Sequence, residues 1–201
     1  SHTKMNENKE SPRCMQRKLK AVATKCKERC ADKLAKVKMI GGSSKSITPS
    51  WDSSDDPSRK CRKQIDSYLR RFGNEVGKGI FLGENGICSF QYHNKFVITI
   101  DVPASGDEIV YIFALVYQID SKRISHRMNI LQTAMQLNYM HQGTRGCTLG
   151  LSGDEIILCF SSSINNLTED TFIAALDDFM TTADECNRAL ELSNSSKSER
   201  R

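Results

Sequence analysis

A histidine and a cysteine close together in the sequence, His141 and Cys147, are the pair whose side chains could support nucleophilic catalysis. A thiol nucleophile needs a nearby base, a third group that orients the base, and donors for the developing oxyanion. The sequence around this pair contains neither an orienting carboxylate nor an oxyanion motif. We therefore expect His141 to end a helix and Cys147 to pack as a small apolar side chain.

A second pair, Cys26 and Cys30, has the spacing of one helical turn and could place two soft metal ligands on one helix face. A tetrahedral site needs two more ligands, and no histidine or further cysteine lies close by. Cys14 and Cys61 are too distant in the sequence to support the site. The sequence therefore predicts no metal and no other cofactor.

The eight cysteines include no C-x-x-C pair, and no basic-then-apolar segment resembles a secretory signal. Disulfides are rare in proteins that stay in a reducing compartment. We therefore expect free thiols and a cytoplasmic protein. No apolar run approaches the roughly 20 residues that cross a bilayer, so no membrane span is expected.

Three pairs of adjacent carboxylates raise the question of acid–base chemistry: Asp107-Glu108, Asp154-Glu155 and Asp177-Asp178. They fall in expected turns or on the solvated side of a helix, where acidic residues mainly favour solubility. Gly77 and Gly79 precede strand-like residues and do not open a helix, so they form no phosphate-binding loop. A binding protein is therefore favoured over an enzyme.

The elements that must position these residues differ in charge along the chain. The 201 residues carry a net charge of +5, but residues 1–63 hold 17 Lys and Arg against 7 Asp and Glu, a net +10. Residues 64–190 hold 9 against 15, a net −6. The sequence therefore predicts a basic arm joined to an acidic domain.

The basic arm comprises residues 1–58. Apolar residues recur at steps of three and four from residue 15 to residue 40, which predicts a basic amphipathic helix over about 13–40. Gly41-Gly42 ends the pattern, and residues 43–58 have the Ser, Asp and Pro content of a linker. The arm could be a solvated tether, bind nucleic acid or an anionic membrane surface, or dock on the acidic domain. Its basic side chains include Arg17, Lys18, Lys20, Lys25, Lys27, Arg29, Lys33 and Lys36.

The rest of the chain divides into a domain, residues 59–192, and a polar tail, 193–201, that we expect to be disordered. Apolar periodicity and turn residues predict elements in the order α-β-β-β-α-β-β-α. Strand and helix units do not alternate regularly, so we expect an α+β fold with an antiparallel sheet packed with helices. The expected helices are 60–77, 123–141 and 168–190, and the expected strands are 87–92, 96–102, 108–118, 147–151 and 155–160, with a short apolar piece at 80–82.

One of these strands contains nine consecutive apolar residues, IVYIFALVY at 109–117. A strand with one wet face would instead alternate apolar and polar residues. The domain's own helices can cover one face of this strand. The other face must meet more of the same chain, a second subunit or a ligand peptide.

The second half of the domain carries a family resemblance. Its segments are LQTAMQLN (131–138), GTRGCTLGL (143–151), DEIILCF (154–160) and LTEDTFIAALDDFMTTADECNRAL (167–190), and GICSF (86–90) agrees in the first half. With these segments, residues 65–190 resemble the Tir-chaperone family, the class I chaperones of bacterial type III secretion. In that family, a helix ending in leucine and asparagine precedes a glycine-containing strand, a hairpin and a phenylalanine-rich helix. The related fold of YbjN-like regulatory proteins is an alternative.

The resemblance implies a type III secretion chaperone-like fold and a homodimer that binds an extended segment of a client protein without nucleotide. Such a segment could add to a sheet edge and place side chains in apolar grooves. For the client groove we predict Leu69, Phe72, Val76, Ile80 and Leu82. For the dimer contact we predict Tyr111, Phe113, Leu115 and Tyr117.

The basic first 60 residues depart from the family pattern, because typical members lack them. We hypothesise that the arm lies in the binding groove of its own or a partner subunit and mimics a client there. The competing hypothesis is a dimeric scaffold or regulator whose arm binds nucleic acid or an anionic surface.

Overall fold

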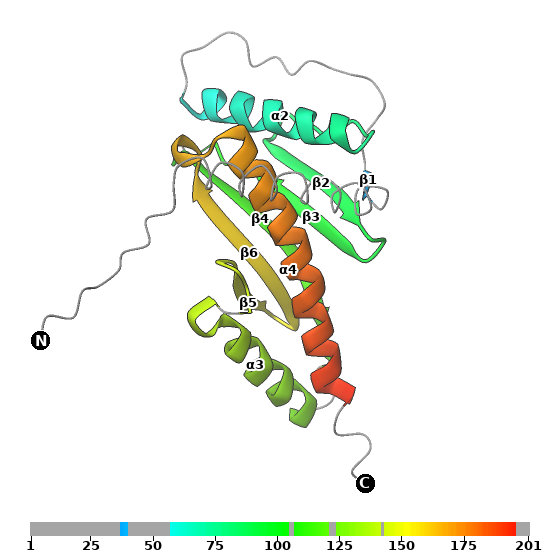
Figure 1. Ribbon diagram of the computed structural model, residues 1–201. Coiled ribbons are helices and arrows are strands. Elements are labelled where there is room, and N and C mark those ends of the chain that lie inside the picture. Colours follow the sequence, from blue (N-terminus) through cyan, green and yellow to red (C-terminus); the bar gives the residue numbers. More distant parts are fainter. Residues whose placement is uncertain (1–36, 40–56, 105–106, 121–123, 142, 196–201) are drawn as a thin grey trace, which may run out of the picture. The chain divides into compact units, whose positions relative to one another are not determined.

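An antiparallel sheet with helices packed on one of its faces forms the domain (Figure 1). The computed structural model describes residues 37–39, 57–104, 107–120, 124–141 and 143–195. The helices are α2 (Pro57–Glu75), α3 (Ile124–Asn138) and α4 (Glu169–Ser195), and the strands are β1 (Val37–Met39), β2 (Ile87–Tyr92), β3 (Phe96–Asp101), β4 (Ile109–Gln118), β5 (Thr148–Ser152) and β6 (Glu155–Ser163). From α2 onward this is the order predicted from the sequence, and the α+β prediction is confirmed.

The strands lie in the order β1-β2-β3-β4-β6-β5, and every neighbouring pair is antiparallel. Short turns explain the pairing of β2 with β3 and of β5 with β6. His93 and Asn94 adopt positive φ between the first pair, and Gly153 does so between the second. The sheet thus contains two hairpins, β2–β3 and β5–β6. Strand β4 lies between them and pairs with β3 on one side and β6 on the other.

Alternation along each strand separates the two faces of the sheet. On β4, Val110, Ile112, Ala114 and Val116 are buried, while the residues between them face away from the helices. Helix α4 crosses β4, and α3 packs on α4 and β5 (Figure 1). Burial of one large apolar side chain stabilises a fold by about 1.5–3 kcal/mol before conformational entropy is counted, so this single covered face holds the core. Its largest fully buried side chains include Phe90, Tyr92, Phe172, Phe179, Ile65 and Leu69.

A bulge in β4 fixes α4 to the sheet. The register with β6 shifts between Leu115 and Tyr117, which leaves Val116 without a β6 partner in the ladder. The Asn187 side chain of α4 donates to the Val116 carbonyl oxygen at 2.6 Å. A buried polar group on α4 thus satisfies a backbone acceptor that the bulge exposes.

Two predicted elements differ from the structure. The piece at 80–82 is not a strand, because the Leu82 amide donates to the Asp66 carboxylate of α2 at 2.8 Å and not to a neighbouring strand. The basic helix was expected to run to residue 40, but residues 37–39 form strand β1. The β-branched Val37 favours an extended backbone, and pairing with β2 overrides the helical period. Residues 13–36 of the predicted helix lie outside the described residues.

Candidate protein-binding surfaces

The face of the sheet on which none of the described helices packs presents a row of large apolar side chains on β4. Tyr111, Phe113 and Leu115 are 39%, 37% and 42% exposed. Tyr117 lies beyond the β4 bulge: it is in register with the buried Ile156, and its hydroxyl lies 3.4 Å from Nε2 of His126 on α3, so it does not share this face. The structure therefore brings three of the four residues predicted for the dimer contact, Tyr111, Phe113 and Leu115, onto one face, which we call the open face; their role in a dimer stays a prediction.

Neighbouring strands extend the open face across the sheet. One row of paired residues runs from Ser89 through Thr99, Phe113 and Cys159 to Thr148. At its β2 end the row is polar, and Ser89 and Thr99 share a hydrogen bond of 3.0 Å between their hydroxyls. At β4 and β6 it becomes apolar. The apolar part of the open face is therefore centred on Phe113 and Cys159.

Helix α3 presents a second apolar surface. The stripe visible in the sequence turns toward solvent, with Ile124, Met128, Met135 and Tyr139 between 62% and 79% exposed. The side of α3 that packs on the domain carries the smaller buried set, Ile130 and Ala134. Periodicity alone finds the stripe but cannot tell that the domain leaves it uncovered.

The Asn138 side chain joins the end of α3 to β5 at the outer edge of the sheet. The Asn138 amide nitrogen donates to the Leu149 carbonyl oxygen at 2.8 Å, and the Leu149 amide donates to the Asn138 side-chain oxygen, also at 2.8 Å. Nearby, Arg127 of α3 forms an ion pair with Asp154 in the β5–β6 turn. Together these contacts place the exposed stripe of α3 beside β5.

At the opposite edge of the sheet, β1 pairs with β2 as a further strand. Val37, Lys38 and Met39 pair with Tyr92, Gln91 and Phe90 in antiparallel register. Strand addition of this kind is a common way for a protein to hold an extended peptide, because backbone hydrogen bonds supply the affinity. The β2 edge is therefore a surface that accepts an extended segment.

The residues predicted for a client groove lie in the core. Leu69, Phe72, Ile80 and Leu82 are each at most 2% exposed, and Val76 is half-buried. The rings of Phe72 and Phe90 lie 6.1 Å apart, so the apolar stripe of α2 packs on the chain's own strand β2. These residues form no open groove here, because a helical stripe marks a buried face without saying what buries it. Their contact with a client stays a prediction.

Polar contacts of α2 hold this buried segment in place. Asp66 accepts the Leu82 amide and also pairs with Arg70 at 2.7 Å. Arg62 donates to the carbonyl oxygens of Val102 and Asn85, both at 3.0 Å, and so fastens the turn before β2. A Cβ atom at Gly86 would lie 2.6 Å from the Arg62 side chain, so this turn requires glycine. Helix α2 is thereby fixed against the start of β2.

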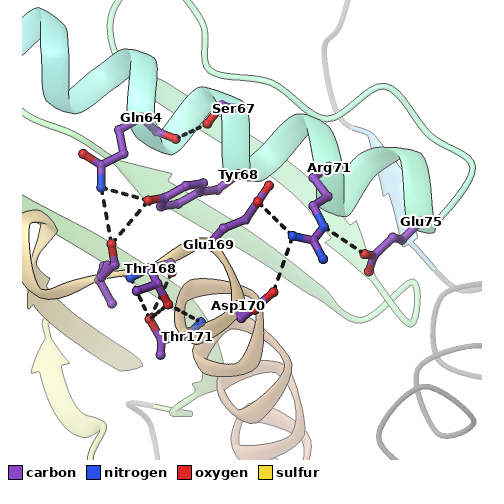
Figure 2. Close-up of polar contacts among 10 residues, drawn as sticks. Gln64, Ser67, Tyr68, Arg71, Glu75, Thr168, Glu169, Asp170 and Thr171 are labelled. Atoms are coloured by element: carbon purple, nitrogen blue, oxygen red, sulfur yellow. Dashed lines mark hydrogen bonds and ion pairs between the residues drawn. The ribbon is translucent and has the colours of Figure 1, made fainter. Parts of the chain in front are cut away.

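The junction of α2 with the start of α4 is polar and solvent-facing (Figure 2). Gln64 donates to the Leu167 carbonyl oxygen at 3.3 Å, as does the hydroxyl of Tyr68. Arg71 pairs with Glu169 at 2.8 Å, and this hydrogen-bonded ion pair raises the pKa of the Arg71 guanidinium. The acidic first turn of α4 suits the positive end of its helix dipole. This junction holds α2 against the start of α4.

The His141 and Cys147 pair meets through the backbone. His141 Nδ1 lies 3.1 Å from the Cys147 carbonyl oxygen, while the thiol is buried. Burial raises the pKa of the Cys147 thiol to about 11, the opposite of the shift that activates a nucleophile. The helix-end histidine and packed thiol expected from the sequence are the arrangement observed.

Neither a metal-binding cluster nor a membrane-spanning helix occurs in the described residues. In these parts of the chain, His, Cys, Asp and Glu side chains do not gather in groups of three that could hold a metal ion. Cys14, Cys26 and Cys30 lie outside the described residues. None of the described helices has the length and apolar character needed to span a bilayer.

Comparison with known proteins identifies the family. The model of the Tir chaperone protein (CesT) family matches residues 67–186, more than half of the chain. The chain belongs to the Tir chaperone family. The resemblance seen in the sequence is therefore confirmed, and the domain is a Tir chaperone domain. No curated protein is similar enough in sequence to count as a match.

Three solved structures are similar to this Tir chaperone domain, and one of them has a TM-score above 0.5. The ExsC–ExsE complex matches with a TM-score of 0.53 and 18% identity, covering 64% of this chain and 95% of that one. The HopA1–SchA chaperone–effector complex matches with a TM-score of 0.48 and 17% identity, covering 70% and 99%. The Yersinia pestis type III secretion chaperone SycH, in complex with a fragment of YscM2, gives 0.43 and 18%, covering 59% and 96%. At these identities, the similarity concerns the fold alone.

Proposed function

We propose that this protein is a non-enzymatic chaperone or adaptor that binds an extended segment of a client protein as a homodimer. Membership of a chaperone family supports a binding role. The observation that carries the proposal is the pairing of β1 with β2, because it shows an extended segment added to the sheet edge. The proposed location is the cytoplasm, where the free thiols described above would persist.

In this proposal the client enters through backbone pairing at β2 and not through a groove in α2. The buried residues Leu69 and Phe72 support β2 from behind, since their side chains lie in the core under the sheet. Ile87, 39% exposed, and the half-buried Gln91 alternate along β2 on the open face. The side chains of a client strand paired with β2 would lie next to those of Ile87 and Gln91.

The homodimer in this proposal forms through the open face and the exposed stripe of α3. A stable interface usually buries about 800 Å² on each partner, more than three β4 side chains can provide alone. The α3 stripe adds large flexible apolar side chains, Met128 and Met135 among them, which suit an interface. The apolar part of the open face, on β4 and β6, and the α3 stripe are both separated from β2 by at least strand β3, so in this proposal the client edge and the dimer contact remain separate.

Site-specific photocrosslinking in an extract of the native cells tests client binding. A benzoylphenylalanine replaces Gln91 in β2, and a control variant carries it at Arg188, an exposed position on α4. We expect a distinct protein crosslinked at position 91 only, with the crosslink inside one short segment. A synthetic peptide of that segment should then bind the purified chain. Identical crosslinks at both positions, or a peptide that does not bind, would overturn the proposal.

A further inference from the structure

Strand β1 occupies the β2 edge although it precedes the domain in the chain. Residues 40–56 connect β1 to α2 in the sequence. The strand that pairs with β2 can therefore come from the same chain or from a second copy of it. In the structure it is the chain's own residues 37–39 that lie against residues 90–92. The free edge of a sheet offers unpaired backbone groups to any strand that can reach it. β1 therefore takes the same backbone groups that a client strand would need.

The pairing of β1 with β2 is short. It covers three residues of β2, which has six. At the other end of β2, the Ile87 carbonyl oxygen already accepts the Gly83 amide at 2.8 Å. A longer strand that continued along β2 from residue 90 toward residue 87 would make additional ladder bonds. A client segment can thus exceed β1 in the number of backbone contacts, while β1 has the advantage of a covalent connection.

Covalent connection matters because it sets the local concentration of β1. A segment tethered by a short linker competes at an effective concentration of about millimolar, whatever the concentration of the protein. Such a competitor lowers the apparent affinity of every guest strand for the β2 edge by the same factor. It can be removed by changing its own residues without touching the β2 surface.

We propose that β1 is an internal competitor for the client: it closes the β2 edge in the free chain and leaves when a client segment adds to β2 as an antiparallel strand. This inference rests on the proposed function and specifies its regulation. It replaces the general expectation that the whole basic arm lies in a groove with one defined contact, residues 37–39 on residues 90–92. The rest of the arm plays no part in it.

A peptide-binding measurement on the full chain tests the competition. The probe is a fluorescent peptide with the sequence of residues 34–42, and binding is followed by anisotropy. The double variant Val37→Pro with Lys38→Pro removes both consecutive amide hydrogens, one of which must point toward β2. The matched control, Ser43→Pro with Ser44→Pro, places two prolines outside β1. A second variant replaces residues 36–40 with glycine and serine at constant length.

We expect the peptide to bind at least tenfold more tightly to the double proline variant and to the glycine–serine variant than to the parent or the control. Equal affinity for all four proteins, or binding to none, would overturn the competitor role. The assay contains no client, so its result is separate from the photocrosslinking experiment. Loss of the client crosslink at position 91 would reject the proposed function and leave the peptide result standing.

Discussion

Asn138 pairs with both backbone groups of Leu149 through its side-chain amide, with two hydrogen bonds of 2.8 Å. A primary amide has the same donor and acceptor as a peptide group, so the side chain takes the place of a neighbouring strand at the edge of β5. Helix α3 ends at this residue, which explains physically why the family pattern ends the helix in leucine and asparagine.

Replacing Asn138 with alanine should destabilise the domain by about 1–3 kcal/mol, because the Leu149 amide and carbonyl lose their partners in a part-buried place. Chemical denaturation followed by circular dichroism measures the change. Gln136→Ala, an exposed position on the same helix, is the control and should change the free energy of unfolding by less than about 0.5 kcal/mol. Equal effects of the two substitutions would contradict the role given to Asn138.

Replacing Phe113 with aspartate should convert the proposed homodimer into a monomer. The substitution puts a charge at the centre of the apolar part of the open face, where a dimer would bury it without a partner. Phe113 is 37% exposed, so the fold of the single chain should survive, and far-ultraviolet circular dichroism checks this. Light scattering after size-exclusion chromatography gives the mass.

The control for this dimer prediction is Leu192→Asp, a substitution of an apolar residue that is 69% exposed near the end of α4. It should leave the mass unchanged. A Phe113→Asp protein that keeps the parent's mass would show that the open face is not the dimer contact.

Cys159 should be the first of the five described cysteines to be alkylated, since it is exposed while Cys61, Cys88, Cys147 and Cys186 are buried. It also pairs in register with Phe113 on the open face. A dimer through that face would cover the thiol, so Phe113→Asp should speed its reaction with iodoacetamide. Mass spectrometry of peptides after short labelling times measures the rate. Uniform labelling of all five thiols in the native protein would contradict the burial pattern.

Alkaline pH should weaken the fold through its buried thiols. Burial raises the pKa of the Cys88 thiol from 9.0 to about 12, so the unfolded chain loses this proton at lower pH than the folded one. The stabilisation is complete below pH 9 and is lost as the pH rises toward 12. Between pH 8 and pH 10 this one group should remove about 1 kcal/mol from the free energy of unfolding.

This alkaline effect is tested by comparing, between variants, how far the free energy of unfolding falls from pH 8 to pH 10. Denaturation under reducing conditions at pH 8 and pH 10 should show a smaller fall in the free energy of unfolding for Cys88→Ala than for the parent. Cys159→Ala, which removes an exposed thiol, should fall nearly as much as the parent. A Cys88→Ala protein with an unchanged fall would place the alkaline sensitivity elsewhere.

Much of the fold could be predicted because local patterns and tertiary packing agree. The position of β3 followed from period-two alternation, that of β4 from its continuous apolar run, and the limits of the strands from turn residues, while Phe172 and Phe179 lie in the core as their helical spacing indicates. The client residues could not be assigned, since Leu69 and Phe72 show the same periodicity whether a helix packs on its own sheet or on another protein. Strand β1 was missed because Val37 and Ile40 also fit a helical period.

The residues of the open face show what a continuous apolar run can and cannot tell. IVYIFALVY predicted a strand in need of cover on both sides, and the described helices leave Tyr111, Phe113 and Leu115 uncovered. Which side chains of a strand share a face depends on the side to which its first side chain points. A continuous apolar run does not carry that information. The register with β3 and β6 supplies that direction.

With Asn138 on β5 and β1 on β2, each end of the sheet meets part of its own chain. Stacking of sheets end to end into a fibre requires two open ends in every molecule, and a molecule with one open end can only terminate such growth. Release of β1 opens one end and leaves Asn138 in place at the other. A chain that exposes its β2 edge to receive a guest strand thus keeps its other edge occupied at Leu149, which opposes end-to-end growth.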